Sequence, residues 1–113
     1  MRDVPQYILI GGEILGEIQF EWDEEKEQLN IEKHGIDFTT AVLVFKDAMY
    51  LELFDEDHST EEERFNIIGM VEEVLFVVYT ERASKIRIIS ARLANKNERE
   101  MYFDSFLYFK GRH

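Results

Sequence analysis

Arginine is concentrated in one stretch of this chain. The residues from Arg64 to Arg92 include 5 basic and 3 acidic side chains. A guanidinium group keeps its charge in proteins and is costly to bury without an anion, so several of them on one small sheet favour a phosphate or carboxylate site. The other interpretation is that they pair with carboxylates of the chain itself, and spacing alone leaves both open. The basic residues are Arg64, Arg82, Lys85, Arg87 and Arg92.

Groups that could transfer protons accompany these cations. If residues 62–70 are extended, Glu62, Arg64 and Asn66 share one face, so Glu62 could act as a base beside a phosphate-binding Arg64 or form an ordinary ion pair. His58 lies in a polar loop, where it could shuttle protons near neutral pH or simply be solvated. Tyr79 is either a platform for stacking bases or a core residue with its hydroxyl at the rim.

Several classes of site are excluded by the residues that the chain lacks. It has no cysteine, its three histidines lie far apart, and it contains neither a glycine-rich phosphate loop nor a Gly-x-Ser-x-Gly motif. These absences remove most metal- and cofactor-dependent enzymes, and we expect no cofactor.

The arginines lie on a predicted antiparallel meander. Three runs rich in β-branched and aromatic residues follow one another over Arg64–Met70, Val74–Glu81 and Lys85–Ala91. The links between them are short and polar, as hairpins require. A further alternating run, Met49–Phe54, predicts a strand before them.

Helices are predicted on both sides of these strands. Asp23 is a good N-cap for a helix that ends at His34-Gly35, with Leu29 and Ile31 as its apolar contacts. A second helix is expected from Asp37 or Thr39 to Lys46, with Phe38, Val42 and Phe45 on one face. A third is expected from Lys96 to about Phe109, capped by Asn95. The predicted class is α+β, with a mostly antiparallel sheet packed against two N-terminal helices and one C-terminal helix.

The composition fits one folded domain of 113 residues with 45% hydrophobic residues and no run long enough to span a membrane. The absence of cysteine favours a cytoplasmic protein. The net charge of −11 resides in residues 1–60, because residues 61–113 are balanced. Residues 1–19 form an N-terminal extension, read as a β-hairpin around Gly11-Gly12, residues 20–109 form the domain, and residues 110–113 form a tail.

Four motifs of the chain, in this order and spacing, resemble the BrnT family, also called DUF497. They are FEWDEEKEQLNIEKHGIDF (20–38), DEDHSTEEERFNIIG (55–69), VVYTER with IRIISAR (77–92), and NER (97–99). The resemblance implies a RelE-like toxin of a type II toxin–antitoxin system, a ribonuclease that inhibits translation. It also implies a BrnA-type antitoxin with a ribbon-helix-helix DNA-binding segment, so that the toxin binds DNA only indirectly, through this partner. The expected assembly is either a homo-oligomer of the toxin or a heterotetramer with the antitoxin.

RelE-like ribonucleases, by this resemblance, need no metal, because the ribose 2′-hydroxyl attacks the adjacent phosphorus while the protein supplies a base, an acid and cations. The expected catalytic residues are Arg64 and Arg82 on the phosphate, Arg92 as a third cation, and Glu62 or His58 as the base. Tyr79, Arg87 and Lys85 are expected to bind RNA. A non-catalytic module that binds the antitoxin and tunes repression of the operon is the alternative.

Overall fold

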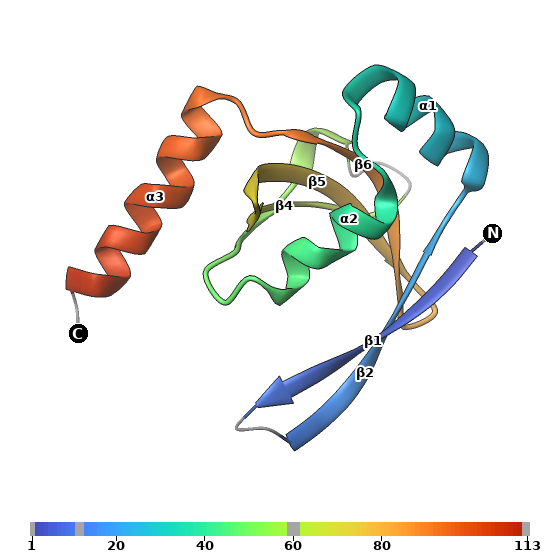
Figure 1. Cartoon of the computed structure of the whole chain (residues 1–113), viewed down its shortest axis with the longest axis horizontal. Coiled ribbons are helices and arrows are strands. Elements are labelled where there is room, and N and C mark those ends of the chain that lie inside the picture. The colour runs from blue at the N-terminus through green and yellow to red at the C-terminus, as the bar shows by residue number, and fades with distance from the viewer. Residues whose placement is uncertain (1, 11–12, 59–61, 112–113) are drawn as a thin grey trace.

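The computed structural model describes residues 2–10, 13–58 and 62–111, and the side chains of residues 18–57, 62–105 and 107. Its centre is a six-stranded sheet in the order β1-β2-β6-β5-β4-β3, seen in Figure 1. The strands are β1 (Arg2–Ile10), β2 (Glu13–Trp22), β3 (Leu51–Phe54), β4 (Arg64–Val71), β5 (Glu73–Arg82) and β6 (Lys85–Leu93). Among the described strands only the β2–β6 pair is parallel, so the predicted α+β class with a mostly antiparallel sheet is confirmed.

The helices begin and end where local capping chemistry places them. Helix α1 (Glu24–His34) starts at Asp23, whose carboxylate accepts from the amides of Glu25 and Lys26, and stops at Gly35 with φ of 72°. The second predicted helix is divided into α2 (Phe38–Val42), capped by Asp37, and the 3₁₀ turn η1 (Leu43–Lys46). Helix α3 (Lys96–Gly111) follows, and a short 3₁₀ turn, η2 (Glu56–His58), succeeds β3.

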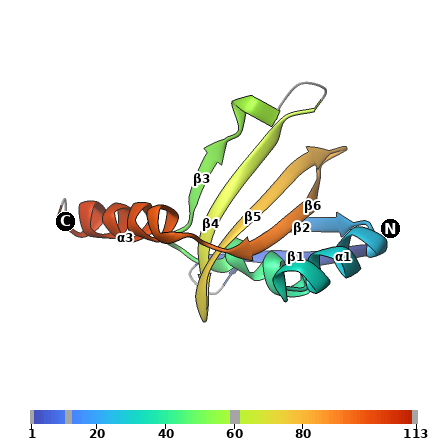
Figure 2. The same cartoon turned by 90° about the horizontal axis from the view of Figure 1, so that it is seen from above.

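Helices α1 and α2 lie on the same side of the sheet, as Figures 1 and 2 show from two directions. The buried core lies between these helices and the sheet. It consists of side chains from α2, η1 and one face of the strands, including Phe20, Trp22, Phe38, Val77 and Ile88. Gly69 of β4 permits this packing, because a Cβ there would lie 3.0 Å from Cβ of Val44. The backbone of η1 therefore sits directly against the sheet.

One packing prediction is wrong. The sequence assigns Leu29 and Ile31 to the buried face of α1, but they are 64% and 36% exposed. The buried residue is Asn30, whose Nδ2 donates to the carbonyls of Ile36 and Ala91 and whose Oδ1 accepts from the Ala91 amide. The helix is therefore attached to β6 by polar contacts, a mode that an apolar pattern cannot reveal.

Helix α3 contacts the other face of the sheet through Tyr102. Tyr102 packs there with Ile68, Val74 and Ala94, and its hydroxyl donates to Asp47 over 2.6 Å. Phe103 and Leu107 remain 45% and 65% exposed. Within the described residues, no helix is both long and apolar enough to cross a membrane.

Candidate active site on the open face of the sheet

A hollow of about 410 Å³ lies on the face of the sheet opposite α1 and α2. Pairing across the strands places Asn66, Val78 and Ser90 in one row and Phe76 opposite Arg92 in the next. The lining residues come from β4, β5, β6 and the loop after β3, and they are Asp55, Arg64, Asn66, Phe76, Val78, Ile89, Ser90 and Arg92. Two of the predicted catalytic arginines, Arg64 and Arg92, thus line a single concavity.

Alternation along paired strands places all five predicted cations on this same face. Arg64 and Arg87 both lie opposite Thr80 in β5, while Arg82 lies opposite Lys85 at the end of the β5–β6 hairpin. Arg82, Lys85 and Arg87 are not among the residues that line the hollow. Only Arg64 and Arg92 of the five therefore reach the hollow itself.

Three of these arginines form ion pairs within the chain. Arg82 pairs with Glu62 at 2.8 Å, Arg87 with Glu21 at 3.2 Å, and Arg92 with Glu98 at 2.7 Å. For these three arginines, the internal pairing that spacing left open is therefore observed. Glu62, two residues before the start of β4, is the partner of Arg82 across the strands.

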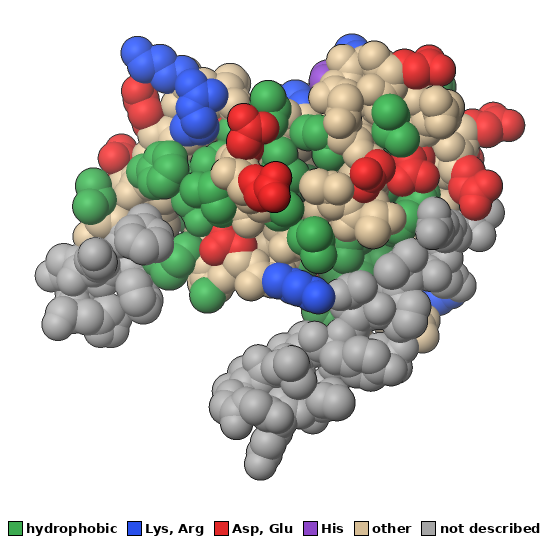
Figure 3. Space-filling view, in the orientation of Figure 1, with side chains coloured by type: hydrophobic (Ala, Val, Ile, Leu, Met, Phe, Trp, Pro, Cys, Tyr) green, Lys and Arg blue, Asp and Glu red, His purple; other side chains and the backbone are tan. Residues whose placement is uncertain are grey.

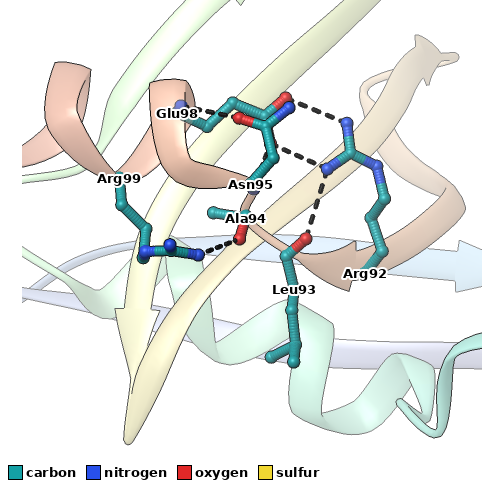
Figure 4. A network of polar contacts seen from close by, with 6 residues as sticks. All are labelled: Arg92, Leu93, Ala94, Asn95, Glu98 and Arg99. Atoms are coloured by element: carbon teal, nitrogen blue, oxygen red, sulfur yellow. Dashed lines mark hydrogen bonds and ion pairs between the residues drawn. The ribbon is translucent and has the colours of Figure 1, made fainter.

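Arg92 of β6 forms an ion pair with Glu98 near the start of α3, as Figure 4 shows. Arg92 donates to both carboxylate oxygens of Glu98, at 2.7 and 2.9 Å. Asn95 and Glu98 also cap the helix reciprocally, each accepting from the amide of the other at 2.8 Å. Burial alone would raise the pKa of Glu98, but the hydrogen bonds from Arg92 and Asn95 outweigh it and hold that pKa below its usual value.

Arg92 is fixed on its other side by an aromatic ring. Its Cζ lies 4.1 Å from the ring centroid of Phe76, a cation–π contact. The pKa of Arg92 is raised, chiefly by the hydrogen bonds to Glu98, although burial acts in the opposite direction. The guanidinium is thus held in one orientation at the rim of the hollow.

Tyr79 lies on the opposite, helix-covered face and is 3% exposed. Its ring stacks on Phe65 with centroids 5.4 Å apart, and its hydroxyl donates to Glu52. Burial, with the neighbouring Glu52, raises the pKa of Tyr79 well above its ordinary range. A ring enclosed in this way cannot stack on a base, so its position favours the core interpretation.

The remaining predicted residues are dispersed. Glu62 and Arg82 form an exposed pair near the open end of the β4–β5 ladder, and Arg87 is held by Glu21 of β2. His58 ends η2, and its side chain lies outside the described residues. No group of three or more His, Asp or Glu side chains in the described part of the chain could hold a metal ion.

The structure adds site residues that the sequence did not single out. Asp55 is the only acid among the residues lining the hollow, and its amide donates to the Arg64 carbonyl at 2.9 Å. Asn66 and Ser90 supply the neutral polar groups of the hollow. Their roles depend on strand register, which the sequence does not give, whereas the Asn-x-x-Glu spacing of the α3 cap could have identified Glu98.

Comparison with known proteins identifies the chain. Residues 22–98 match the family described as the ribonuclease toxin, BrnT, of type II toxin–antitoxin systems. This chain belongs to the BrnT family. The matched residues include α1, α2, the meander and the first turn of α3, and hence every residue that lines the hollow. No curated protein matches the sequence.

A solved BrnT structure has a similar fold. The 1.1 Å crystal structure of the Brucella abortus ribonuclease toxin BrnT superposes with a TM-score of 0.53 and 26% sequence identity. The match covers 66% of this chain and 94% of the Brucella chain. The predicted toxin–antitoxin family is therefore confirmed, and this chain has about a third of its length outside the shared structure.

Proposed function

We propose that this BrnT-family protein cleaves RNA without a metal ion and that the hollow on the open face of the sheet is its active site. The supporting observation is that Arg64 and Arg92, from two strands, line the same hollow within the segment that matches the family. A hollow with cations on its walls can stabilise the extra negative charge that develops on a phosphate during cleavage.

The proposed reaction begins with attack by the ribose 2′-hydroxyl oxygen on the adjacent phosphorus. A base removes the hydroxyl proton, the bond from phosphorus to the 5′-oxygen breaks, and an acid protonates that oxygen, leaving a 2′,3′-cyclic phosphate. Arg64 binds the phosphate, and Arg92 provides a second cation whose orientation Glu98 and Phe76 fix. Asp55, Glu62 and His58 are the candidate bases, and the position of Asp55 in the hollow favours it.

The test compares variants in which a single cation is lost. Purified protein is incubated with RNA of mixed sequence, and cleavage products are resolved by electrophoresis and tested for cyclic phosphate ends. Arg64→Ala should lower the cleavage rate by about 10²-fold, the loss expected for one charge-stabilising group. Arg99→Ala is the matched control, because Arg99 lies on α3, donates to the Ala94 carbonyl and is not among the residues that line the hollow. Equal rates for wild type and Arg64→Ala would remove Arg64 from the mechanism.

A second candidate function is supported by the ion pairs. Because Arg82, Arg87 and Arg92 already bind carboxylates, the protein could bind only its antitoxin and tune repression. A folded wild-type protein that leaves RNA intact and binds the antitoxin tightly would establish this function and refute the nuclease proposal.

The wider setting of the proposal follows the family resemblance. The partner is a BrnA-type ribbon-helix-helix antitoxin, the fold is RelE-like, the site of action is the cytoplasm, and the outcome is inhibition of translation. The acidic first half of the chain, with carboxylates gathered over α1 in Figure 3, suits a basic arm of such a partner.

A further inference from the structure

Asn66 lines the hollow and has an unsatisfied acceptor. Its Oδ1 is shielded from water and has no hydrogen-bond partner among the described residues. Buried polar groups in native proteins nearly always have partners, and exceptions often mark places where a ligand or a bound water completes the bonding. Because Asn66 lines the hollow, a rotation of its side chain would offer this acceptor to a donor that enters there.

The surroundings of Asn66 strengthen any hydrogen bond made there. Val78 lies opposite it in β5, and Phe76 and Ile89 line the same hollow. Apolar walls lower the local dielectric constant, so one hydrogen bond discriminates more sharply than it would in water. A volume of about 410 Å³ falls within the range of small-ligand sites and suits a single nucleotide.

The spacing from Arg64 indicates which part of RNA reaches Asn66. Both side chains project from β4 on the same face, two residues apart, which is about 7 Å along a strand. That separation matches the step from a phosphate to the sugar or base of the same nucleotide. An arginine on the phosphate would bring the attached nucleoside over Asn66.

We propose that Asn66 selects the nucleotide beside the phosphate that Arg64 binds, with Oδ1 accepting a hydrogen bond from that nucleotide. This inference rests on the proposed nuclease function. The donor is either the ribose 2′-hydroxyl, which distinguishes RNA from DNA, or an N–H group on a base edge. Ser90, on the far side of Val78 in the same row, provides a hydroxyl elsewhere in the lining of the hollow.

The experiment measures binding and cleavage with defined oligonucleotides. Wild type, Asn66→Ala and Asn66→Asp are titrated with fluorescent single-stranded RNA and DNA of the same sequence, and cleavage positions are mapped on an RNA that contains every dinucleotide step. Asn97→Ala is the control, because Asn97 is an exposed asparagine on α3. Circular dichroism checks that each variant is folded. Asn66→Asp keeps an acceptor of the same shape, so it tests the proposal even if the alanine variant unfolds.

Two results support the proposal and separate the two donors. If the ribose is the donor, Asn66→Ala loses about 10-fold in RNA affinity but none in DNA affinity, and Asn66→Asp keeps the RNA preference while repulsion weakens both complexes. If a base is the donor, Asn66→Ala keeps the wild-type ratio of RNA to DNA affinity. The same variant loses the wild-type preference for particular dinucleotide steps and cleaves all of them at similar rates.

Two other results overturn it. If wild type cleaves RNA, and the Asn66 variants match it in affinity ratio and in cleavage pattern, the role of Asn66 is refuted while the nuclease function stands. If folded wild type neither binds nor cleaves RNA, the proposed function fails and the role of Asn66 fails with it.

Discussion

Replacing Asn30 should destabilise the protein more than replacing any exposed polar residue. Asn30 is 6% exposed and makes three hydrogen bonds of 2.8 to 3.1 Å with the backbone of Ile36 and Ala91. Each bond contributes about 1 kcal/mol net, and removing the side chain also leaves buried backbone groups without partners. We expect Asn30→Ala to cost about 3–5 kcal/mol, a large part of the 5–15 kcal/mol that typically stabilises a domain.

Urea unfolding followed by fluorescence measures this loss directly. Trp22 is the only tryptophan and is fully buried, so its emission reports exposure of the core. The exposed Asn97 provides the control, since Asn97→Ala should change the free energy of unfolding by less than about 0.5 kcal/mol. A loss below about 1 kcal/mol for Asn30→Ala would refute the view that these bonds attach α1 to β6.

The isosteric variant Asn30→Asp separates hydrogen bonding from size. Its carboxylate can still accept from the Ala91 amide, but the second oxygen faces the carbonyls of Ile36 and Ala91. Burial and these carbonyls favour the protonated acid, so its pKa is raised in the folded state. Stability should therefore increase as the pH falls from 7 through that raised pKa. A variant less stable at pH 5 than at pH 7, relative to wild type, would contradict this reasoning.

Two further predictions concern the α3 cap and the β5–β6 turn. Glu98→Gln should lose less stability than wild type between pH 7 and about pH 3. The lowered pKa of Glu98 stabilises the fold at pH values above the usual carboxylate pKa, and this contribution disappears as the pH falls through the folded-state pKa. Urea titrations at both pH values measure the difference, and equal losses would argue against a stabilising pair. Ser84→Gly should raise the free energy of unfolding by about 0.5–1 kcal/mol, because Ser84 has φ of 68° in a two-residue turn. Ser105→Gly, inside α3, should lower it by a similar amount, and the same sign for both would show that backbone strain at Ser84 is not the cause.

Local chemistry made much of the fold predictable. The strands of the meander are joined by tight turns, so their pairing follows from sequence order, and the structure confirms it over Arg64–Val71, Glu73–Arg82 and Lys85–Leu93. The starts of α1 and α3 were equally predictable from the sequence, because the side chains of Asp23 and Asn95 cap the two helices. These features depend on residues within a few positions of one another.

Features that depend on distant residues were not predictable. The parallel contact of β2 with β6 joins Glu21 to Arg87, 66 positions apart, and no local pattern encodes it. The composition of the hollow depends on an irregularity between Val78 and Tyr79 that resets the register of β6. A correct list of strands therefore does not identify which arginines meet, and only Arg64 and Arg92 share the hollow.

The ion pairs on the open face differ in how readily a phosphate could replace the carboxylate. Arg82 and Glu62 are 48% and 32% exposed at their side chains, and such surface pairs contribute at most about 1 kcal/mol. Glu98 is 14% exposed, accepts two bonds from Arg92 and also caps α3, so its release would disturb the helix start as well. Phosphate recruitment should therefore engage Arg82 before Arg92. On this argument Arg92 acts as a fixed wall of the hollow, with a charge partly offset by Glu98.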